Sequence, residues 1–524
     1  MLALIGAEQP LRDCLGDRDC LGDTEAPVAV RRRAAESLGL LAKRSGDREQ
    51  RDRIAGELEG WLRSDALDLR IEQVSEPSAV AAAREAAQRQ VATKVAQARA
   101  TGQLGKLKEV QLLQMIREAE EQIAQQERWA MGQSPGWAEH DALLPLLQGA
   151  SRGLQLAASA DLPLLGSGPG RLVPMLTLTA QEEDTALRIR SEVVDCELWR
   201  LPLPSGEQLE LVLVKGGKYG IGSPVEQAGR AVYAEERFRQ KCEGVDVEAL
   251  RQVQLVSYAM VRHPISQAQW RVVVEGMAPE QRGQLQASPG TFREEDHWER
   301  YGQPGALPVD SVSWNQCQQW LEALNSWLAC QWPDWAEQHP GLGSQALQLA
   351  LPSESQWEVA CRAGSATPFH FGSTLDPSWA RYNATYTYGR GRRGGYEKRP
   401  VPIGFFGLVN RWGLAEMHGQ LLEWCGDQWH RSPIREDLGK RRGWFGGGGT
   451  TQELLDGRAL EGPDPGLAEF PSEQEMKLLR GGSWILNPRI ARAAFRDGSR
   501  PDDVYASVGV RPGCFSPPGL LLSS

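Results

Sequence analysis

The sequence predicts an α+β protein in which a mostly α-helical N-terminal region precedes a domain of short strands and turns. Before residue 200, long stretches rich in Ala, Glu, Gln, Arg and Leu carry apolar residues at helical spacing and few β-branched runs. After residue 200, short strand patterns alternate with turns, and most of the 18 Trp are found there. A chain of 524 residues is too long for one compact core, so we expect about two or three domains.

Residues 1–160 are expected to form the helical region. Within it, VRRRAAESLGLLAK and, after a Gly-Asp turn, RDRIAGELEGWLR resemble one HEAT-type helical pair. Helical spacing also covers residues 78–90 and 107–130. A single pair cannot bury its apolar face alone, so it either packs on the helices that follow or is a remnant of a repeat; an amphipathic hairpin without repeat ancestry is the alternative. We expect these helices to mediate protein–protein contacts.

Residues 161–199 are predicted to be a linker, because residues 162–179 are rich in Pro, Gly, Leu and Ser and lack periodicity. The C-terminal domain is expected over residues 200–515. It opens with LELVLVKGGKYGIGSP, an alternating strand pattern followed by a Gly-rich turn. Two later segments, SVSWNQCQQWLEALN and PSESQWEVACRAG, begin with Ser near a Trp-bearing amphipathic run, which predicts capped helices packed on a sheet.

Composition excludes several classes of protein. No run approaches the roughly 20 apolar residues of a membrane helix, and the start MLALIGAEQPLRDC has no basic region before an apolar core, so neither a membrane span nor a secretory signal is expected. Nine Cys without a CxxC pair are typical of reduced thiols, and we expect a cytoplasmic protein. The formal net charge of −10 argues against a general affinity for nucleic acid or anionic lipid, since both bind clustered positive charge.

Six motifs follow one another in the C-terminal domain. After the Gly-rich strand and turn come VRHPISQAQW, LPVDSVSWNQCQQWLEALN, LALPSESQWEVACRAG, VNRWGLAEMHGQLLEWCGD and the segment from RGGSW to GVR. In order and spacing they resemble the formylglycine-generating enzyme family, also called the sulfatase-modifying factor domain, over about residues 200 to 515. The resemblance implies an elaborated C-type lectin fold, in which residues 410–427 are a turn-rich segment.

Residues 479–511 combine a rigid frame with positions of mixed chemistry. The frame consists of residues that fix turns, anchor hydrogen bonds or fill a core: Arg480, Gly481, Gly482, Ser483, Trp484, Arg492, Arg496, Pro501, Gly509 and Arg511. Between them lie apolar, acidic, aromatic and small side chains without the period of a helix or a strand: Ile485, Leu486, Asn487, Ile490, Phe495, Asp497, Gly498, Ser499, Asp503, Tyr505, Ala506 and Ser507. A variable, loop-borne surface on a fixed scaffold is where binding usually takes place. We therefore predict these positions, in a variable region over residues 485–507, to be ligand-binding.

The resemblance bears on catalysis as well. In the enzymes of this family, two cysteines in the segment after Gly-Gly-Ser-aromatic bind copper and activate oxygen. Leu486 and Ala491 hold those places here, and neither side chain can bind a metal or form a thiolate. The related sulfoxide synthases need a non-haem iron held by several His, largely from a helical domain, whereas the N-terminal half offers only His140. We therefore expect no enzymatic activity and no catalytic cofactor; a formylglycine-generating or sulfoxide-synthase-like oxidase, or a decayed member of the family, is the alternative.

The same segment resembles the variable region of diversity-generating retroelement proteins, in which adenine-directed mutagenesis rewrites Asn-type codons on a C-type lectin scaffold. The template spacing of GGSW, NP, R.A.R, PD and GxR with variable positions between them is reproduced closely, although Val510 replaces the aromatic residue of GFR. A codon of the AAC kind, changed only at its adenines, never yields Trp, Lys, Glu, Gln or Met. None of these five occurs from Ile485 to Ser507. The resemblance thus implies a diversified ligand-binding site.

The side chains of the variable region indicate the kind of ligand. Phe495 and Tyr505 offer large rigid area, while Asp497, Asp503 and Ser499 offer adaptable polar contacts, as in antibody loops. This mixture favours a protein or peptide ligand whose identity the sequence does not define. The frame arginines are expected to bond to loop carbonyls or carboxylates and to stiffen the site, which reduces the entropy lost on binding. We expect the predicted positions to converge on one solvent-facing patch, with Trp484 in the core beneath it.

The family resemblance also implies a structural calcium ion, held by an Asn in a loop and by carbonyls and an acid near an N-V-x-E-W motif. The counterparts here are Asn383 in RYNAT and the residues from Gln420 to Glu423 in GQLLEW. Gln in place of Asn at position 420 lengthens a ligand, which a hard oxygen site accommodates only by adjusting its loop. The alternative is that Glu423 is a carboxylate that accepts backbone N–H bonds.

Overall fold

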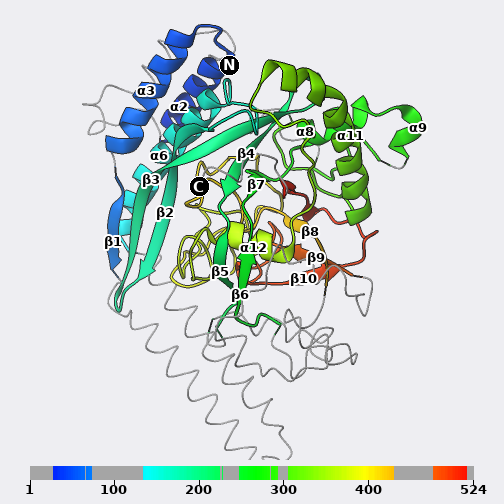
Figure 1. The fold of residues 1–524 in the computed structure, drawn as a ribbon. Coiled ribbons are helices and arrows are strands. Elements are labelled where there is room, and N and C mark those ends of the chain that lie inside the picture. The colour runs from blue at the N-terminus through cyan, green and yellow to red at the C-terminus, as the bar shows by residue number, and fades with distance from the viewer. Residues whose placement is uncertain are drawn as a thin grey trace, which may run out of the picture.

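The computed structural model describes residues 28–64, 66–72, 134–224, 227, 247–283, 285–292, 305–429 and 476–515 (Figure 1). The helices expected over residues 78–90 and 107–130 lie outside these ranges. The described chain contains both helices and strands, with a helical N-terminal part, which confirms the predicted α+β class. No helix in these ranges has the length and apolarity that a membrane span requires.

Within the described residues, the helices of the N-terminal layer are α2 (Val28–Arg44), α3 (Arg48–Ser64) and α6 (Gly136–Ala158). The predicted helical pair is confirmed as α2 and α3. Asp47 caps α3, because its carboxylate accepts the backbone N–H of Glu49 at 2.9 Å. The backbones of α2 and α6 approach closely, since a Cβ added to Gly39 would lie 2.2 Å from the backbone oxygen of Gly153. The pair thus buries its apolar face against α6.

A large sheet joins the two halves of the chain. Its strands are β1 (Asp68–Glu72), β2 (Arg171–Glu182), β3 (Ala186–Pro202), β4 (Gln208–Val214), β7 (Tyr258–Val261) and β12 (Gly513–Cys514). They pair antiparallel in the order β1-β3-β4-β7-β12, and β2 pairs with β3. In this register Val212 lies between Leu198 and Met260.

The predicted linker over residues 161–199 is wrong, because β2 and most of β3 occupy it as a long antiparallel hairpin. The physical reason is that β2 is buried on both faces. Met175 packs in one core cluster and Leu176 and Leu178 pack in another, so the run LVPMLTLTA shows no simple alternation. Pro174 is tolerated because β2 lies at the edge of this pairing, where a missing N–H costs little.

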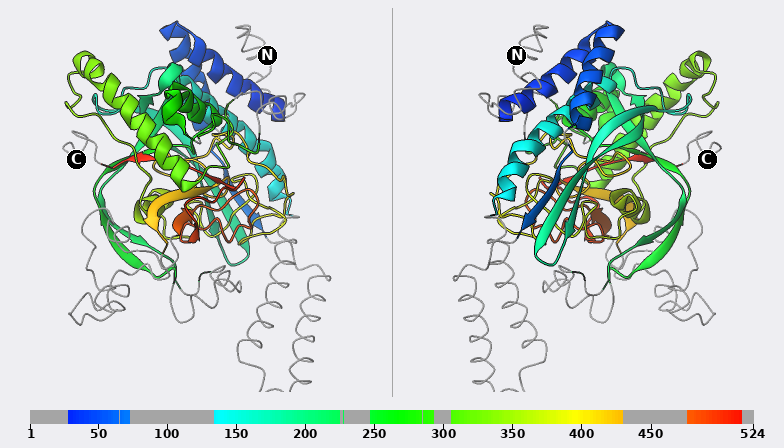
Figure 2. Two further views of the ribbon diagram at one scale, coloured as in Figure 1. Left: turned by 90° about the vertical axis from the view of Figure 1, so that its right-hand side faces the viewer. Right: turned by 90° about the vertical axis from the view of Figure 1, so that its left-hand side faces the viewer.

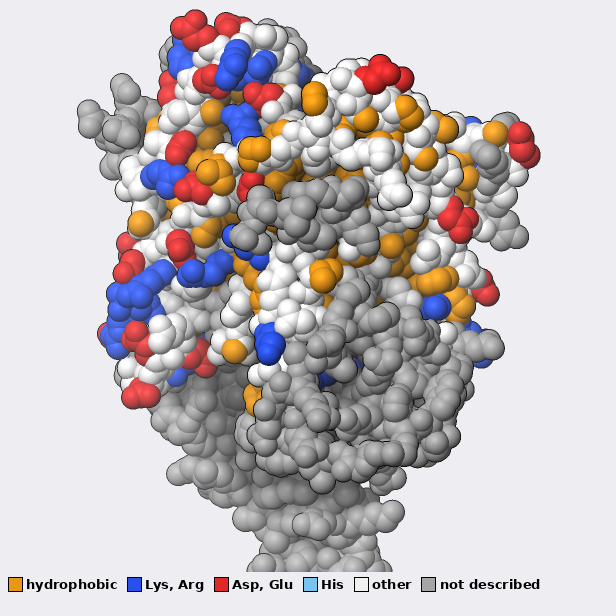
Figure 3. Space-filling model, in the orientation of Figure 1, with side chains coloured by type: hydrophobic (Ala, Val, Ile, Leu, Met, Phe, Trp, Pro, Cys, Tyr) orange, Lys and Arg blue, Asp and Glu red, His pale blue; other side chains and the backbone are white. Residues whose placement is uncertain are grey.

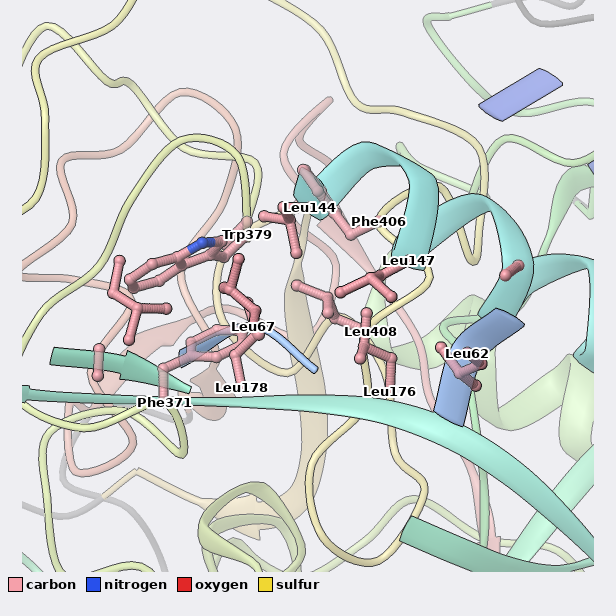
Figure 4. Close-up of a cluster of buried hydrophobic side chains, with 14 of the residues drawn as sticks. Leu62, Leu67, Leu144, Leu147, Leu176, Leu178, Phe371, Trp379, Phe406 and Leu408 are labelled. Atoms are coloured by element: carbon pink, nitrogen blue, oxygen red, sulfur yellow. The ribbon is translucent and has the colours of Figure 1, made fainter. Parts of the chain in front are cut away.

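The helical region and the C-terminal domain share one core (Figure 4). This cluster brings together Leu62 of α3, Leu144 and Leu147 of α6, Leu176 and Leu178 of β2, and Phe371, Trp379, Phe406 and Leu408 from later loops. Apolar burial on this scale is the main stabilising contribution to a fold. The boundary expected near residue 160 therefore does not separate two cores.

The C-terminal domain contains the helices α8 (Gln267–Gly276), α9 (Pro279–Arg282), α11 (Trp314–Gln338) and α12 (Glu354–Arg362), with a short 3-10 helix η3 (Pro204–Gly206). The two helices predicted from the Ser motifs are confirmed. Ser313 and Ser353 are their N-caps, and each forms a capping box with the Gln three residues later. These local hydrogen bonds explain why α11 and α12 begin where the sequence indicates.

The described chain also contains two smaller sheets. One pairs β5 (Gly217–Ile221) with β6 (Arg251–Leu255). The other has the order β10-β9-β8-β11 and contains β8 (Leu422–Gln428), β9 (Lys477–Arg480), β10 (Asp497–Ser499) and β11 (Val508–Gly509). The turn-rich segment expected over residues 410–427 therefore ends in strand β8. In both views of Figure 2 this second sheet, in orange and red, lies below the blue helices α2 and α3. It holds the segment 479–511, which leaves through β9 and returns through β10 and β11.

The outer strands of the large sheet carry a surface of mixed charge. Arg188 bonds to Asp68 at 2.9 Å, and Arg70 bonds to Glu183 at 2.8 Å. Figure 3 shows basic and acidic side chains interspersed over this part of the molecule. Exposed pairs of this kind contribute at most about 1 kcal/mol each. The stability of these strands therefore comes from the core beneath them.

Candidate ligand-binding site

The segment after β9 begins with a tight turn at Gly481 and Gly482. Their φ angles are 98° and 74°, in the left-handed region that residues with a Cβ rarely adopt. A Cβ on Gly482 would also lie 2.8 Å from Cα of Ala491, so the chain passes over itself here without room for a side chain. The two glycines therefore set the direction in which the segment leaves the sheet.

Backbone hydrogen bonds hold the rest of the segment against neighbouring loops. The residues of the segment whose main-chain atoms form these bonds include Gly481, Trp484, Leu486, Ala493, Pro501, Tyr505, Ser507 and Val510. The N–H of Asn383 donates to the oxygen of Leu486 at 2.9 Å, and the N–H of Ser311 donates to the oxygen of Tyr505 at 3.1 Å. Every residue type carries a main-chain oxygen. The path of the segment therefore does not depend on which side chains stand at positions 486 and 505.

Arg480 joins the middle of the segment to helix α12. Its guanidinium donates to Glu354 at 3.3 Å and to Glu358 at 2.5 Å. It also donates to the backbone oxygens of Ala493 and Phe495, both at 2.7 Å. The side chain is fully buried, and a buried charge is tolerated only when it is paired and hydrogen-bonded in this way. Residues 493–495 are thereby held in the interior.

The other three frame arginines are paired in the same manner. Their carboxylate contacts are Arg492 with Glu248 at 2.7 Å, Arg496 with Glu354 at 3.0 Å, and Arg511 with Glu423 at 3.0 Å. Both partners of each pair are almost completely buried. The prediction that the frame arginines bond to carbonyls and carboxylates is confirmed. A scaffold of this kind is rigid, because breaking one pair leaves a buried charge.

The two carboxylates of α12 remain charged within this network. Burial raises the pKa of Glu354, but the charges of Arg496 and Arg480 outweigh burial and lower its pKa to about 2. The pKa of Glu358 is lowered as well, because Arg362 and Arg480 outweigh burial. Neither carboxylate is among the residues predicted from the sequence. A signal for them exists, since their spacing on a capped helix places both on one face.

Two stretches of the variable region face solvent. Ile485 is 41% exposed and Tyr505 is 48% exposed. Val504 is not among the predicted positions, yet it is 49% exposed. The partly exposed predicted positions are Leu486, Asn487, Asp497, Ser499, Asp503, Ala506 and Ser507. The surface available to a ligand thus consists of residues 485–487, Asp497 and residues 499–507.

Three predicted ligand-binding positions are buried instead. Ile490 is 7% exposed, Phe495 is 6% exposed, and Gly498 is buried too. A Cβ on Gly498 would lie 2.8 Å from the ring of Trp429, so a larger residue does not fit. The expectation that these three face solvent is wrong. Arg480 binds the backbone oxygens of Ala494 and Phe495 and holds Phe495 in the core, and Gly498 pairs with Leu478 of β9. Phe495 is a packing residue rather than an exposed anchor.

A small polar network orders the second exposed stretch. The carboxylate of Asp503 accepts hydrogen bonds from Ser499 Oγ at 2.6 Å, from the backbone N–H of Arg500 at 3.1 Å and from the Tyr505 hydroxyl at 3.4 Å. The bond from Ser499 contributes most to lowering the pKa of Asp503. The Tyr505 ring is thus oriented by its hydroxyl group while its face remains exposed.

Trp484 lies beneath the exposed stretches. It is 7% exposed and its indole N–H donates to the oxygen of Ala506 at 3.1 Å, which confirms its predicted place in the core. Two rings from outside the segment contact it: Phe292 lies edge-on with centroids 5.2 Å apart, and Tyr396 is stacked at 6.3 Å. Neither ring is among the residues predicted from the sequence, because loops distant in sequence bring them there.

Glu423 does not fit the calcium site that the family resemblance implies. Its carboxylate accepts hydrogen bonds from Trp357 Nε1 at 2.7 Å and from Arg511 Nε at 3.0 Å, so a guanidinium already neutralises it. The side-chain oxygen of Asn383 is used by the hydroxyl of Thr385 at 2.7 Å. Within the described ranges, no three His, Cys, Asp or Glu side chains meet in a group that could hold a metal ion. Glu423 is therefore a hydrogen-bonded carboxylate, but its donors are side chains. The alternative expected from the sequence, in which backbone N–H groups are the donors, is not what the structure has.

Comparison of the sequence with known protein families identifies the family of this chain. The model of the sulfatase-modifying factor enzyme 1-like domain matches residues 202–512, which include the motifs, the frame arginines and the variable region. The chain belongs to this family. The match confirms the formylglycine-generating-enzyme-like fold that the order of the six motifs predicts.

The relatives of this sulfatase-modifying factor domain protein include hercynine oxygenases. The hercynine oxygenase of Mycolicibacterium smegmatis is 26% identical over 281 residues, which are 49% of this chain and 53% of the relative. That of Mycobacterium tuberculosis is 28% identical over 170 residues, 31% of each protein. The chain thus spans about half the length, or less, of the curated relatives it matches. Among solved structures, Treponema denticola variable protein 1 aligns at 15% identity with a TM-score of 0.37, over 61% of this chain and 99% of that one.

The expectation that the chain has no enzymatic activity is corrected by these relatives. It was based on Leu486 and Ala491, which stand where the family's copper-binding cysteines are found. Relatives named hercynine oxygenase are enzymes, and they point toward enzymatic activity. Leu486 and Ala491 therefore exclude a thiolate at these two positions, but they do not exclude enzymatic activity.

Proposed function

We propose that the chain binds a protein or peptide ligand through the exposed part of the variable region, and that the side chains there can be exchanged without loss of the fold. One observation carries this proposal. Main-chain hydrogen bonds and buried arginines hold the path of the segment, whereas Ile485, Val504 and Tyr505 point their side chains to solvent. A loop on a rigid scaffold loses little entropy on binding, which favours affinity.

The residue types in the segment support exchange at the exposed positions. Residues 485–507 contain no Trp, Lys, Glu, Gln or Met, the residues that an AAC codon cannot yield when only its adenines change. The exposed and partly exposed positions nevertheless include an aliphatic, an amide, an acidic and an aromatic side chain: Ile485, Asn487, Asp503 and Tyr505. Diversification of these codons accounts for both the variety and the missing types.

Two matched libraries of the full chain test this proposal. The first randomises the solvent-facing or partly exposed Ile485, Leu486, Tyr505 and Ser507. The second randomises the same number of buried positions, Ile490, Ala491, Phe495 and Gly498. After selection on a panel of purified proteins, we expect folded binders from the first library alone. Equal loss of folded protein in both libraries would show that the side chains cannot be exchanged, and folded members without any binder would refute ligand binding.

The gene itself offers an independent test of diversification. A near-copy of the segment should lie beside a reverse transcriptase gene. Copies of the gene from independent isolates should differ within codons 485–507, and only at bases that are adenines in that near-copy. Differences spread evenly over the gene would contradict diversification. That result would leave ligand binding by the segment to the library experiment.

An oxygenase activity is the second candidate, because hercynine oxygenases are among the curated relatives. The test is oxygen consumption by the full chain in the presence of hercynine and a thiol, with and without added iron(II), followed by mass spectrometry of the products. Consumption above that of heat-denatured chain, together with an oxidised product, would support this candidate. Consumption equal to the denatured control under both conditions would remove it. Ligand binding by the variable region is compatible with either result.

A further inference from the structure

Exposed apolar side chains concentrate around the variable region. Large hydrophobic residues of the described chain that are exposed include Tyr386, Ile485, Val504 and Tyr505, and the remaining ones are Leu172, Leu250 and Val256. Three of the first four belong to the variable region, and Tyr386 belongs to a loop bonded to it. Clustered apolar side chains mark an interaction site, whereas isolated ones are ordinary surface residues.

The residues after Asn383 form one side of this cluster. The N–H of Asn383 donates to the oxygen of Leu486 at 2.9 Å, and the N–H of Tyr386 donates to the oxygen of Asn383 at 3.3 Å. The chain then returns to the same place, because the ring of Tyr396 stacks on that of Trp484. Tyr386 is 54% exposed, so its ring extends the apolar surface beyond the variable region.

Phe292 and Ser311 form a second side. The Phe292 ring meets the ring of Trp484 edge-on. The hydroxyl groups of Thr291 and Ser311 are hydrogen-bonded at 2.8 Å, and the N–H of Ser311 donates to the oxygen of Tyr505 at 3.1 Å. The exposed stretch around Tyr505 is therefore bordered by residues that do not belong to the variable region.

The surface around the two sides carries opposite charge. On the first side, Arg390 is bonded to the backbone oxygen of Ala186 and Arg392 to Asp376, and the remaining charged residues are Arg393, Glu397, Lys398 and Arg399. The exposed stretch of the variable region beside the second side carries Asp497, Arg500, Asp502 and Asp503. Positive charge is thus in excess on the first side and negative charge on the stretch beside the second. Lys398 is exposed, and its Nζ lies 5.8 Å from the centre of the Tyr396 ring, which keeps a cation at the border of the aromatic group.

We propose that the loop 383–398 and Phe292 are a fixed part of the binding site, shared by chains with different variable regions, and that the partner is a polypeptide segment. This proposal rests on ligand binding by the exposed variable region. The partner presents one apolar side chain to Tyr386, Ile485 and Tyr505. An acidic residue on one flank faces Arg393 and Lys398, and a basic residue on the other flank faces the acidic side of the site.

A carbohydrate fits this surface less well than a polypeptide. A sugar presents hydroxyl groups that must be hydrogen-bonded when they lose water. Here Oδ2 of the Asp503 carboxylate is already used by Ser499, Arg500 and Tyr505. The Trp484 ring is buried, so it offers no open face for stacking. Apolar side chains at the surface suit the mixed polarity of a peptide.

The test uses the full chain on an array of short synthetic peptides of random sequence, beside an array of glycans. Bound peptides should share an apolar residue with Asp or Glu on one flank and Lys or Arg on the other. The double charge reversal Arg393→Glu, Lys398→Glu should switch the preference on the first flank from acidic to basic. It should also weaken peptides selected with the parent chain about tenfold or more.

A second variant tests the apolar part of the fixed side. Tyr386→Ser should weaken the selected peptides by a similar factor, about tenfold, because an exposed aromatic anchor is lost. Leu172→Ser on β2 and Lys218→Glu on β5 are matched controls, since both replace exposed residues outside the cluster. Both controls should change the affinity by less than about twofold, as neutral surface positions do. Thermal melting confirms that each variant is folded.

The outcomes separate this proposal from the proposed function. One outcome is that the selected peptides lose affinity for Ile485→Ser and Tyr505→Ser but keep it for Tyr386→Ser and for the charge reversal. This result would overturn the proposed fixed side and leave binding by the variable region intact. Peptides that depend on Tyr386 but not on Ile485 or Tyr505 would refute binding by the variable region. Binding to glycans alone, or to neither array, would overturn the polypeptide partner.

Discussion

The Nδ1–H of His418 donates a hydrogen bond of 2.7 Å to the backbone oxygen of Ala491, and so joins the scaffold to the buried side of the variable region. Nε2 of the same ring accepts the backbone N–H of His370 at 3.0 Å. Because both ring nitrogens are used, only the neutral ring with its proton on Nδ1 satisfies both partners. Protonation of Nε2 would place its N–H against the backbone N–H of His370, so that two donors would face each other.

Acid should therefore lower the stability of the fold. Burial and the charge of Arg362 lower the pKa of His418 to about 4, and burial also lowers the pKa of His370. In the unfolded chain a His titrates at about 6.5, so the unfolded state binds protons that the folded state does not. The free energy of unfolding should fall as the pH drops from about 6.5 to about 4, by up to about 3 kcal/mol for His418. Urea denaturation across this range measures the effect.

His418→Gln should make this pH dependence shallower, because one of the two buried rings is removed. His339→Gln, at the end of α11, is the matched control and should leave the slope unchanged. An identical slope in His418→Gln and in the parent chain would mean that other groups cause the acid sensitivity.

Breaking the buried pair of Arg492 and Glu248 should be strongly destabilising. Both side chains are 0% exposed and their contact is 2.7 Å. Arg492→Leu leaves the Glu248 carboxylate buried without its cation, which should cost about 3–5 kcal/mol in chemical denaturation. The double variant Arg492→Leu, Glu248→Leu should lose less than the sum of the single changes, because no uncompensated charge remains.

The exposed pair of Arg63 and Asp195 is the control for this experiment. Its contact is 2.8 Å, but the side chains are 43% and 49% exposed. Arg63→Leu should change the free energy of unfolding by at most about 1 kcal/mol. A similar loss in Arg63→Leu and Arg492→Leu would contradict the role assigned to burial.

Substitutions in the variable region should divide by burial rather than by residue type. Phe495→Ala and Trp484→Ala remove buried rings and should each cost about 3–5 kcal/mol. Ile485→Ala and Tyr505→Ala should change the free energy of unfolding by no more than about 0.5 kcal/mol, as exposed positions do. Thermal and urea denaturation of the four variants gives the comparison. Equal losses in both pairs would mean that the exposed side chains are packed in solution.

Gly482→Ala should destabilise the turn at the start of the segment. The left-handed backbone costs an L-residue about 1–2 kcal/mol, and the contact of a Cβ with Ala491 adds to that cost. Gly220→Ala on β5 is the control, because a Cβ there meets nothing within 4 Å. The melting temperature should fall in Gly482→Ala and stay close to that of the parent in Gly220→Ala. A tolerated alanine at position 482 would show that the turn can relax.

Features that depend on local chemistry could be predicted from the sequence. Ser313 and Ser353 begin their helices because an N-cap hydrogen bond is formed within a few residues. The frame arginines could be predicted because a charged side chain repeated among turns needs nearby carbonyls and carboxylates. The order of the six motifs defined the family, because each motif encodes a helix cap, a turn or a strand of the same fold.

Features that depend on packing between distant parts of the chain could not be predicted from the sequence, and the tertiary structure decided them. Ile485 and Ile490 are the same residue type in the same segment, yet one is 41% exposed and the other is 7% exposed. The partner of Arg492 is a carboxylate 244 residues away. No local pattern encodes such a distance, because burial and pairing are set by whichever surface the folded chain presents. The division of the variable region into an inner and an outer part is of this kind.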